Sequence, residues 1–136
     1  MELVAGCDEV GRGALAGPLV AAAVLVRSSA RRPRWLPAGR DSKLLSPRRR
    51  AEIAERALQS FCCGLGAVER MELDEVGVAR ANQLAIHRAV ASLPLQPSRL
   101  VVDYVAGFRH QLPTELVVRC DVSRWPIALA SVVAKV

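Results

Sequence analysis

The feature that most constrains the fold is the run of residues 19–26, LVAAAVLV, which is apolar at every position. A strand with one face in water alternates apolar and polar side chains, whereas a strand covered on both faces is apolar throughout. A second apolar run, residues 3–7, ends at Asp8 and Glu9, and a glycine-rich segment joins it to the first. The pattern predicts two strands joined by a loop, with residues 19–26 in the interior of a sheet.

Helices and further strands alternate along the rest of the chain. Ser46 and Pro47 form an N-cap and first-turn pair, and an apolar stripe from Ala54 to Phe61 predicts a helix after them. We expect strands at residues 61–68, 100–102 and 116–118. Residues 71–93 should be mostly helical and stopped by Pro94, and a last helix should open at Pro126 with no C-cap before the chain ends. This alternation predicts an α/β architecture, with all 136 residues in a single domain.

Composition narrows the class of protein and its partners. The net charge of +6 favours a polyanionic partner, because basic side chains displace the counterions of phosphate groups. Residues 14–26 are too short and too interrupted to cross a bilayer, and the acidic residues near the N-terminus do not fit a secretory signal. We therefore expect a cytoplasmic protein. Its four cysteines match no metal-finger spacing and are predicted to be free thiols.

Two acidic residues stand at the ends of predicted strands. Asp8 follows residues 3–7 and Asp103 follows residues 100–102. If these strands are neighbours in the sheet, their carboxylates meet at one edge and repel each other unless cations lie between them. Carboxylate oxygens without nitrogen or sulfur ligands favour Mg²⁺ or Mn²⁺. Acids at strand ends also serve as loop caps or solvated residues, so the spacing alone leaves both interpretations open.

A longer pattern resembles a known family. Residues 6–24, GCDEVGRGALAGPLVAAAV, closely resemble the N-terminal signature of ribonuclease HII. Four further segments are similar to elements of that family in the same order, together with Asp121: DSKLLS at 41–46, ANQLA at 81–85, VVD at 101–103 and ASVVAKV at 130–136. The likeness extends over the whole chain. It implies a ribonuclease H-like mixed β-sheet flanked by helices, and family members continue into further C-terminal helices that this sequence lacks.

The resemblance also implies a set of site residues. Asp8, Glu9, Asp103 and Asp121 would be the catalytic carboxylates and would hold two divalent ions, Mg²⁺ or Mn²⁺. Substrate would be bound by the loop that senses the ribonucleotide and by several side chains near the duplex backbone: Gly11, Arg12, Gly13, Lys43, Ser131 and Lys135. The 2′-hydroxyl is the group that distinguishes RNA from DNA at such a loop.

The implied activity is that of an endonuclease. It would hydrolyse the RNA strand of RNA/DNA hybrids and cut on the 5′ side of ribonucleotides embedded in duplex DNA, leaving a 5′-phosphate. The partner would be that nucleic acid, with no membrane and no protein partner implied, and the chain is expected to be a monomer. The alternative is a catalytically impaired nucleic-acid-binding fragment of such an enzyme, because the C-terminal part of the family is missing.

Other motifs have plainer interpretations. Gly11-x-Gly13 after a strand could open a dinucleotide-binding loop, but a strand-like run follows where that fold needs a helix.

We expect His87 at the surface and His110 in a polar loop, neither of them catalytic. For Trp35 and Trp125 we favour core packing over stacking on nucleic acid. The arginines at 31–32 and 48–50 could contact phosphates or form a solvated face, and the sequence does not decide between these.

Overall fold

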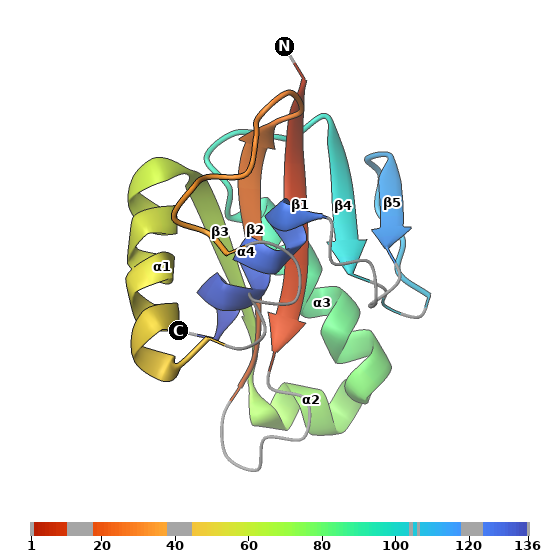
Figure 1. The fold of residues 1–136 in the computed structure, drawn as a ribbon. Coiled ribbons are helices and arrows are strands. Elements are labelled where there is room, and N and C mark those ends of the chain that lie inside the picture. Colours follow the sequence, from red (N-terminus) through yellow and green to blue (C-terminus); the bar gives the residue numbers. More distant parts are fainter. Residues whose placement is uncertain are drawn as a thin grey trace.

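The computed structural model describes residues 2–10, 18–37, 45–103, 105, 107–117 and 124–135. Strands and helices alternate along the described chain, as the sequence predicted, and Figure 1 shows their arrangement. In chain order the elements are β1 (Leu3–Val10), β2 (Leu19–Arg27), α1 (Pro47–Ser60), β3 (Cys62–Val68), α2 (Arg70–Val76), α3 (Val78–Ala91), β4 (Arg99–Asp103), β5 (Thr114–Val117) and α4 (Trp125–Ala134).

The strands form one mixed sheet in the order β3-β2-β1-β4-β5. β1 pairs antiparallel with β2, and β2 pairs antiparallel with β3. On its other side β1 pairs parallel with β4, which in turn pairs parallel with β5. β1 is therefore central, and the acids at its end lie in the middle of the sheet.

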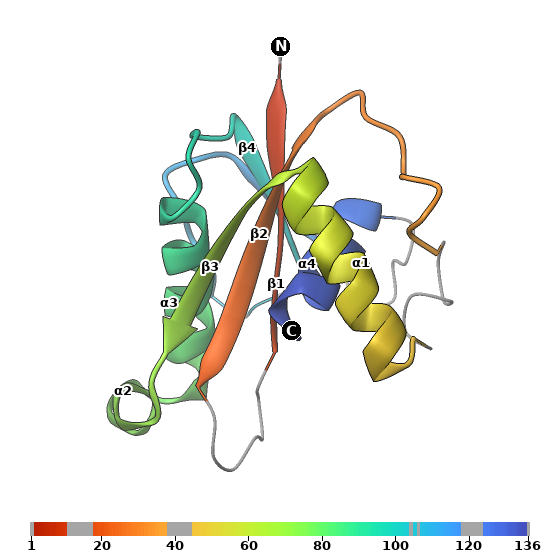
Figure 2. The same ribbon diagram turned by 90° about the vertical axis from the view of Figure 1, so that its left-hand side faces the viewer.

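Helices cover both faces of the sheet. Figure 2 shows α3 on one face and α1 with α4 on the other. In β2 the side chains alternate between the two layers, since Leu19, Ala21 and Ala23 lie in the core under α3 while Ala22 and Val24 lie in the core under α1 and α4. The prediction that residues 19–26 lie inside the sheet with both faces covered is confirmed.

The first helix is confirmed, and residues 71–93 are mostly helical, as predicted, although Pro94 is not what ends the helix. Ser46 caps α1, its hydroxyl oxygen accepting the amide N–H of Arg49 at 3.1 Å. Residues 71–93 do not form one helix, because Gly77 has φ 85° and separates α2 from α3. α3 also ends at Ala91, before Pro94 is reached, with Ser92 as its C-cap.

The last strand and the last helix differ slightly from expectation. β5 covers Thr114–Val117, so it begins before residue 116, and Val118 lies outside the described residues. α4 begins at Trp125 and does not run to the end of the chain, since Lys135 is its C-cap and donates its amide N–H to the Ser131 carbonyl.

The tryptophans pack as predicted. Both are partly buried against the core under α1 and α4, and the ring of Phe61 stands between them, with its centroid 6.4 Å from that of Trp35 and 5.8 Å from that of Trp125. The described cysteines, Cys7, Cys62 and Cys63, are free thiols, as expected, and Cys120 lies outside the described residues. None of the helices in the described ranges has the length and apolar character needed to cross a membrane.

Candidate metal centre

The sheet brings two of the predicted acids side by side. β1 and β4 run parallel, and Cys7 is the register partner of Val102. The next residue on each strand is an aspartate, so Asp8 and Asp103 stand opposite each other where the two strands lie about 4.8 Å apart. Both carboxylates belong to the face that carries α4, since Val4 and Val101, in step with them, lie in the core under that helix.

Asp8 is held in a buried and negatively charged environment. Its exposed fraction is 9%, and its Oδ1 accepts the amide N–H of Glu9 at 2.8 Å. Burial, followed by the neighbouring charges of Asp103 and Glu9, raises the pKa of Asp8 to about 7, against the lowering effect of hydrogen bonds from the Glu9 amide and the Ser131 hydroxyl. A metal-free site therefore resists full ionisation at neutral pH.

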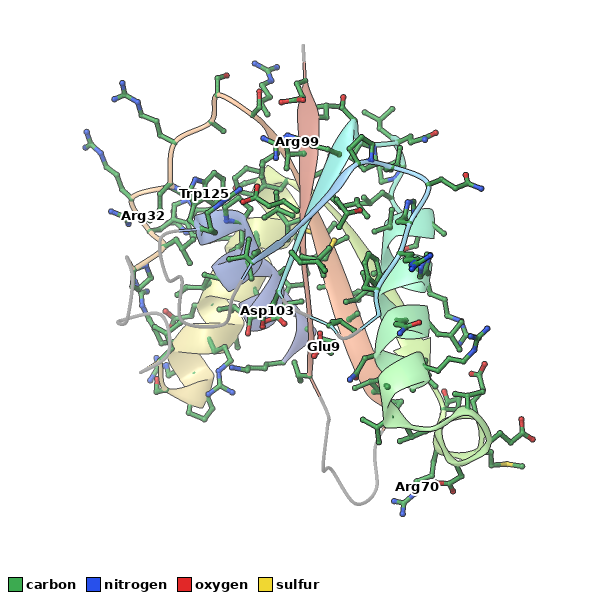
Figure 3. The ribbon with its side chains drawn as sticks, turned by 90° about the vertical axis from the view of Figure 1, so that its right-hand side faces the viewer. Glu9, Arg32, Arg70, Arg99, Asp103 and Trp125 are labelled. Atoms are coloured by element: carbon green, nitrogen blue, oxygen red, sulfur yellow. The ribbon has the colours of Figure 1, made fainter. Side chains whose placement is uncertain are left out.

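Glu9 adjoins this pair from the other side of the strand. It follows Ala5 and Cys7 in the series of β1 side chains that faces α3, and its exposed fraction is only 6%. Its negative charge still raises the pKa of Asp8. Figure 3 shows Glu9 and Asp103 near the same end of the sheet. Three of the four predicted carboxylates thus lie at one end of β1 and β4.

α4 positions one of the groups that contacts Asp8. Ser131 lies on this helix and hydrogen-bonds the Asp8 carboxylate. The start of the helix is pressed onto β1 at Gly6, where an added Cβ would lie 2.5 Å from the Cβ of Pro126. Only glycine lets the helix approach the strand this closely. Gly6 therefore sets how closely α4 packs on β1 next to the aspartates.

Several predicted site residues lie outside the described residues, namely Asp121, Gly11, Arg12, Gly13 and Lys43. Among those described, Lys135 is exposed just beyond α4, and Ser131 is in contact with Asp8. Sequence reasoning assigned Ser131 to the nucleic acid and missed this contact, and it gave no role to Gly6 beyond its place in the motif. Two features of the sequence could have suggested the role of Gly6 and the contact of Ser131. One is the glycine two residues before Asp8, and the other is the serine five residues after Pro126, about one helical turn and a half along α4.

The donor set suits a hard divalent cation. The side chains of Asp8, Glu9 and Asp103 offer carboxylate oxygens, and Ser131 adds a hydroxyl, with no thiol or imidazole assigned to the centre. Within the described ranges, no group of three or more His, Cys, Asp and Glu side chains is placed to hold a metal ion. The described residues supply a facing pair of aspartates, with Glu9 on the opposite face of β1, and the predicted fourth ligand, Asp121, lies outside them.

Solved structures with the same arrangement of elements define the class of fold. The ribonuclease H2 from Pyrococcus horikoshii OT3 superimposes with a TM-score of 0.82 at 24% identity, over 98% of this chain and 70% of that one. The ribonuclease HII in a complex with PCNA from Archaeoglobus fulgidus gives a TM-score of 0.70 at 23% identity, over 98% of this chain and 71% of that one. The fold is therefore the ribonuclease H-like fold.

Sequence comparison is more specific. The family model for Ribonuclease HII matches residues 5–136. A ribonuclease HII of Thermus thermophilus is 43% identical over 143 residues, covering 98% of this chain and 63% of the relative. A ribonuclease HII of Dehalococcoides mccartyi is 42% identical over 135 residues, with the same coverage of 98% and 63%. The chain belongs to the Ribonuclease HII family, and it spans about 63% of the length of these relatives.

Proposed function

We propose that this protein is a divalent-metal-dependent endonuclease that hydrolyses the RNA strand of RNA/DNA hybrids and cuts on the 5′ side of ribonucleotides embedded in duplex DNA. The observation that carries the proposal is the parallel register of β1 and β4, which sets Asp8 beside Asp103 in a chain of the Ribonuclease HII family. Buried like charges cost free energy in the folded state, and a bound cation offsets that cost.

In this proposal Asp8, Glu9, Asp103 and Asp121 hold two Mg²⁺ or Mn²⁺ ions. Bound ions of this kind supply Lewis acidity, which activates water and stabilises charge on the phosphate oxygens. The structure of a relative, Bst-RNase HIII, was solved in complex with Mn²⁺, which supports the choice of ion. The protein's own contribution is to orient the Asp8 carboxylate through the Glu9 amide and the Ser131 hydroxyl, two hydrogen bonds that favour its ionised form against the effect of burial.

The same proposal assigns substrate recognition to residues around the carboxylates. Gly11, Arg12 and Gly13 follow β1 directly in sequence and would sense the 2′-hydroxyl, while Lys43, Ser131 and Lys135 would face the duplex backbone. Since a phosphodiester has no hydrogen-bond donor, Ser131 can serve both roles only if its hydroxyl donates to Asp8 and its oxygen accepts from a 2′-hydroxyl of the substrate. We further propose that residues 1–136 act as one catalytic domain, as a monomer in the cytoplasm.

The test uses three labelled duplexes of one sequence, which differ only in the sugars of one strand. One is all DNA, one contains a single ribonucleotide, and one has an RNA strand paired with DNA. The purified chain, with folding verified by circular dichroism, is incubated with each over a range of Mg²⁺ and Mn²⁺ concentrations. The proposal expects cleavage 5′ of the ribonucleotide, with 5′-phosphate and 3′-hydroxyl ends, and an intact all-DNA duplex.

Two other results would contradict the proposal. If the folded chain leaves every duplex intact at all metal concentrations, this protein has no nuclease activity. If it binds the hybrid without cutting it and Mn²⁺ changes nothing, the impaired binding fragment replaces the nuclease as the better description.

A further inference from the structure

A small cleft lies at the opposite end of the β1–β4 pair from the carboxylates. Its volume is about 150 Å³, which is below the range of pockets that hold drug-sized ligands. Its polar walls come from β2, β4 and the residue before α4, and they include three arginines, Arg27, Arg99 and Arg124. Trp125 and Pro126 close it on the α4 side. Such a space suits a single small anion and not a whole nucleotide.

The charges around the cleft do not cancel. Arg124 forms a bidentate pair with Glu115, at 2.7 and 2.9 Å, and Arg99 contacts Glu2 at 3.4 Å and Glu115 at 3.9 Å. Arg27 makes no ion pair with any residue in the described ranges. Among the described residues, three guanidinium groups stand against two carboxylates, which leaves one positive charge at the cleft.

The geometry of the guanidinium groups indicates which anion fits. Arg99 and Arg124 are already fixed by their glutamate partners, so little side-chain entropy is lost when a ligand binds to them. Guanidinium forks match the oxygens of phosphate. α4 also begins at this cleft, so the positive end of its dipole adds to the attraction. A tetrahedral oxyanion with a net negative charge meets all of these conditions.

The cleft lies within reach of a duplex bound at the aspartates. Val4 lines the cleft and Asp8 lies four residues further along β1, which corresponds to about 13 Å of strand. A nucleic-acid strand rises about 3.4 Å per nucleotide, so this separation corresponds to roughly four nucleotides. Figure 3 shows Arg99 and Trp125 toward one end of the sheet and Asp103 and Glu9 toward the other.

We propose that this cleft binds one phosphate group, with Arg27 as the residue that gains a partner when it does. The assignment of that phosphate to the backbone of a bound hybrid rests on the proposed function, whereas binding of a free phosphate ion does not. If the phosphate belongs to a bound hybrid, the cleft adds one phosphate contact to the interface with the nucleic acid, away from the cleavage point.

The main experiment measures binding of the RNA/DNA hybrid without divalent metal, over a series of salt concentrations. Each phosphate contact contributes about 0.9 to the slope of log affinity against log salt. Arg27→Ala should weaken binding several-fold and reduce that slope by about 0.9. Glu2→Gln should strengthen binding, because it removes a negative charge from Arg99. The matched control is Arg70→Ala on α2, which removes the same charge on the far side of the molecule (Figure 3).

A second arm identifies the source of the phosphate. Inorganic phosphate is titrated at constant ionic strength while the emission of Trp125 is followed in a Trp35→Phe background, with and without Arg27→Ala. An Arg27-dependent change in emission together with an Arg27-dependent salt slope supports a site for a backbone phosphate. The emission change without any effect on the slope supports a site for free phosphate.

The proposal is overturned if Arg27→Ala alters neither measurement, or if Arg70→Ala reduces the salt slope as much as Arg27→Ala does. Failure of the nuclease proposal would look different. Neither of these assays depends on cleavage of the hybrid, so a chain that never cuts can still show both Arg27 effects. If the chain binds no hybrid, the phosphate titration alone tests whether the cleft binds phosphate.

Discussion

The two ends of the β1–β4 pair carry charge in opposite ways. At the carboxyl ends, Asp8 and Asp103 stand next to each other, and Asp8 is buried among negative groups. At the other end, Arg99 is half-buried between Glu2 and Glu115, and Arg124 joins the same network. The same two strands thus hold like charges together at one end and opposite charges at the other.

The difference shows where the fold tolerates an electrostatic cost. Ion pairs of partly exposed side chains contribute little to stability and cost little to form. A buried carboxylate beside a partly buried one destabilises the folded protein, and the buried one, Asp8, responds with a raised pKa. Perturbed pKa values of this kind cluster at functional sites, which is why the acidic end is the candidate site.

Removal of one charge at the acidic end should have the largest effect. Asp103→Asn keeps the shape of the side chain but removes a carboxylate that faces Asp8. We expect cleavage of the ribonucleotide-containing duplex to fall by about 10²–10³-fold, as is typical for loss of a principal electrostatic group, while metal-free duplex binding stays within several-fold. Single-turnover cleavage and fluorescence polarisation measure the two quantities.

The control for that variant is Asp74→Asn, which removes an exposed carboxylate on α2. It should cleave like the parent protein. Equal cleavage by Asp103→Asn and Asp74→Asn would mean that the facing aspartates play no part in the reaction, and the comparison between the two ends of the sheet would lose its functional meaning.

The pH dependence of stability should show the cost of the acidic end directly. The pKa of Asp8 is raised from 3.8 to about 7 in the folded protein. Between those values the folded state binds more protons than the unfolded state, so the free energy of unfolding falls as pH rises, by an amount on the order of a few kcal/mol. Asp8→Asn should remove most of this slope in metal-free urea denaturation at pH 5 and pH 8.

Divalent ions should reverse the trend, because they bind the ionised form. Mn²⁺ is expected to stabilise the parent protein more at pH 8 than at pH 5 and to leave Asp8→Asn nearly unchanged. A metal-free parent protein whose stability stays flat or rises between pH 5 and pH 7 would show that Asp8 is not held protonated by its neighbours.

Packing above the acidic end can be tested with a pair of glycines. A Cβ at Gly6 would meet Pro126 of α4 at 2.5 Å, and a Cβ at Gly66 would meet the Ala85 carbonyl oxygen of α3 at 2.3 Å. Each change to alanine should cost about 1–3 kcal/mol of stability, because the helix must move away from the sheet. Urea denaturation gives both values.

Only Gly6→Ala should affect the carboxylate site. Gly6→Ala moves the helix that holds Ser131 against Asp8, so it should also lower cleavage and raise the apparent pKa of Asp8, which the Ser131 hydrogen bond lowers. Gly66→Ala acts on the α3 face and should leave that pKa in place. If both variants change the titration equally, α4 has no special role at the aspartates.

The smallest effect is expected at the basic end. Glu115→Gln removes the shared partner of Arg99 and Arg124, and its side chain is 50% exposed. Its loss should change the free energy of unfolding by less than about 1 kcal/mol. A loss of several kcal/mol in thermal denaturation would show that the ion pairs at this end are as important to the fold as the core.

Much of the fold was predictable because periodicity reports burial. The uninterrupted apolar run of β2 indicated helices on both faces, and Ser46 with Pro47 marked the start of α1. The break at Gly77 was missed, since a glycine inside a helical pattern can be accommodated or can adopt positive φ, and only its neighbours determine which.

The candidate site was predictable to the level of residue type. The resemblance pointed to Asp8, Glu9, Asp103 and Asp121. The structure places the first three at one end of the sheet, and Asp121 lies outside the described residues. The hydrogen bond between Ser131 and Asp8 was not predictable, because it depends on how closely α4 approaches β1. That approach is decided by contacts between Gly6 and Pro126, which are distant in sequence.

The sequence by itself determined the family, the order of strands and helices, and which side chains carry negative charge at strand ends. Only the tertiary structure decided that β1 and β4 are parallel neighbours in a register that sets Asp8 beside Asp103. Hydrophobic periodicity specifies which face of a strand is buried and is a local property of the chain. Strand pairing is selected by the packing of the whole sheet between its helices, which no single segment encodes.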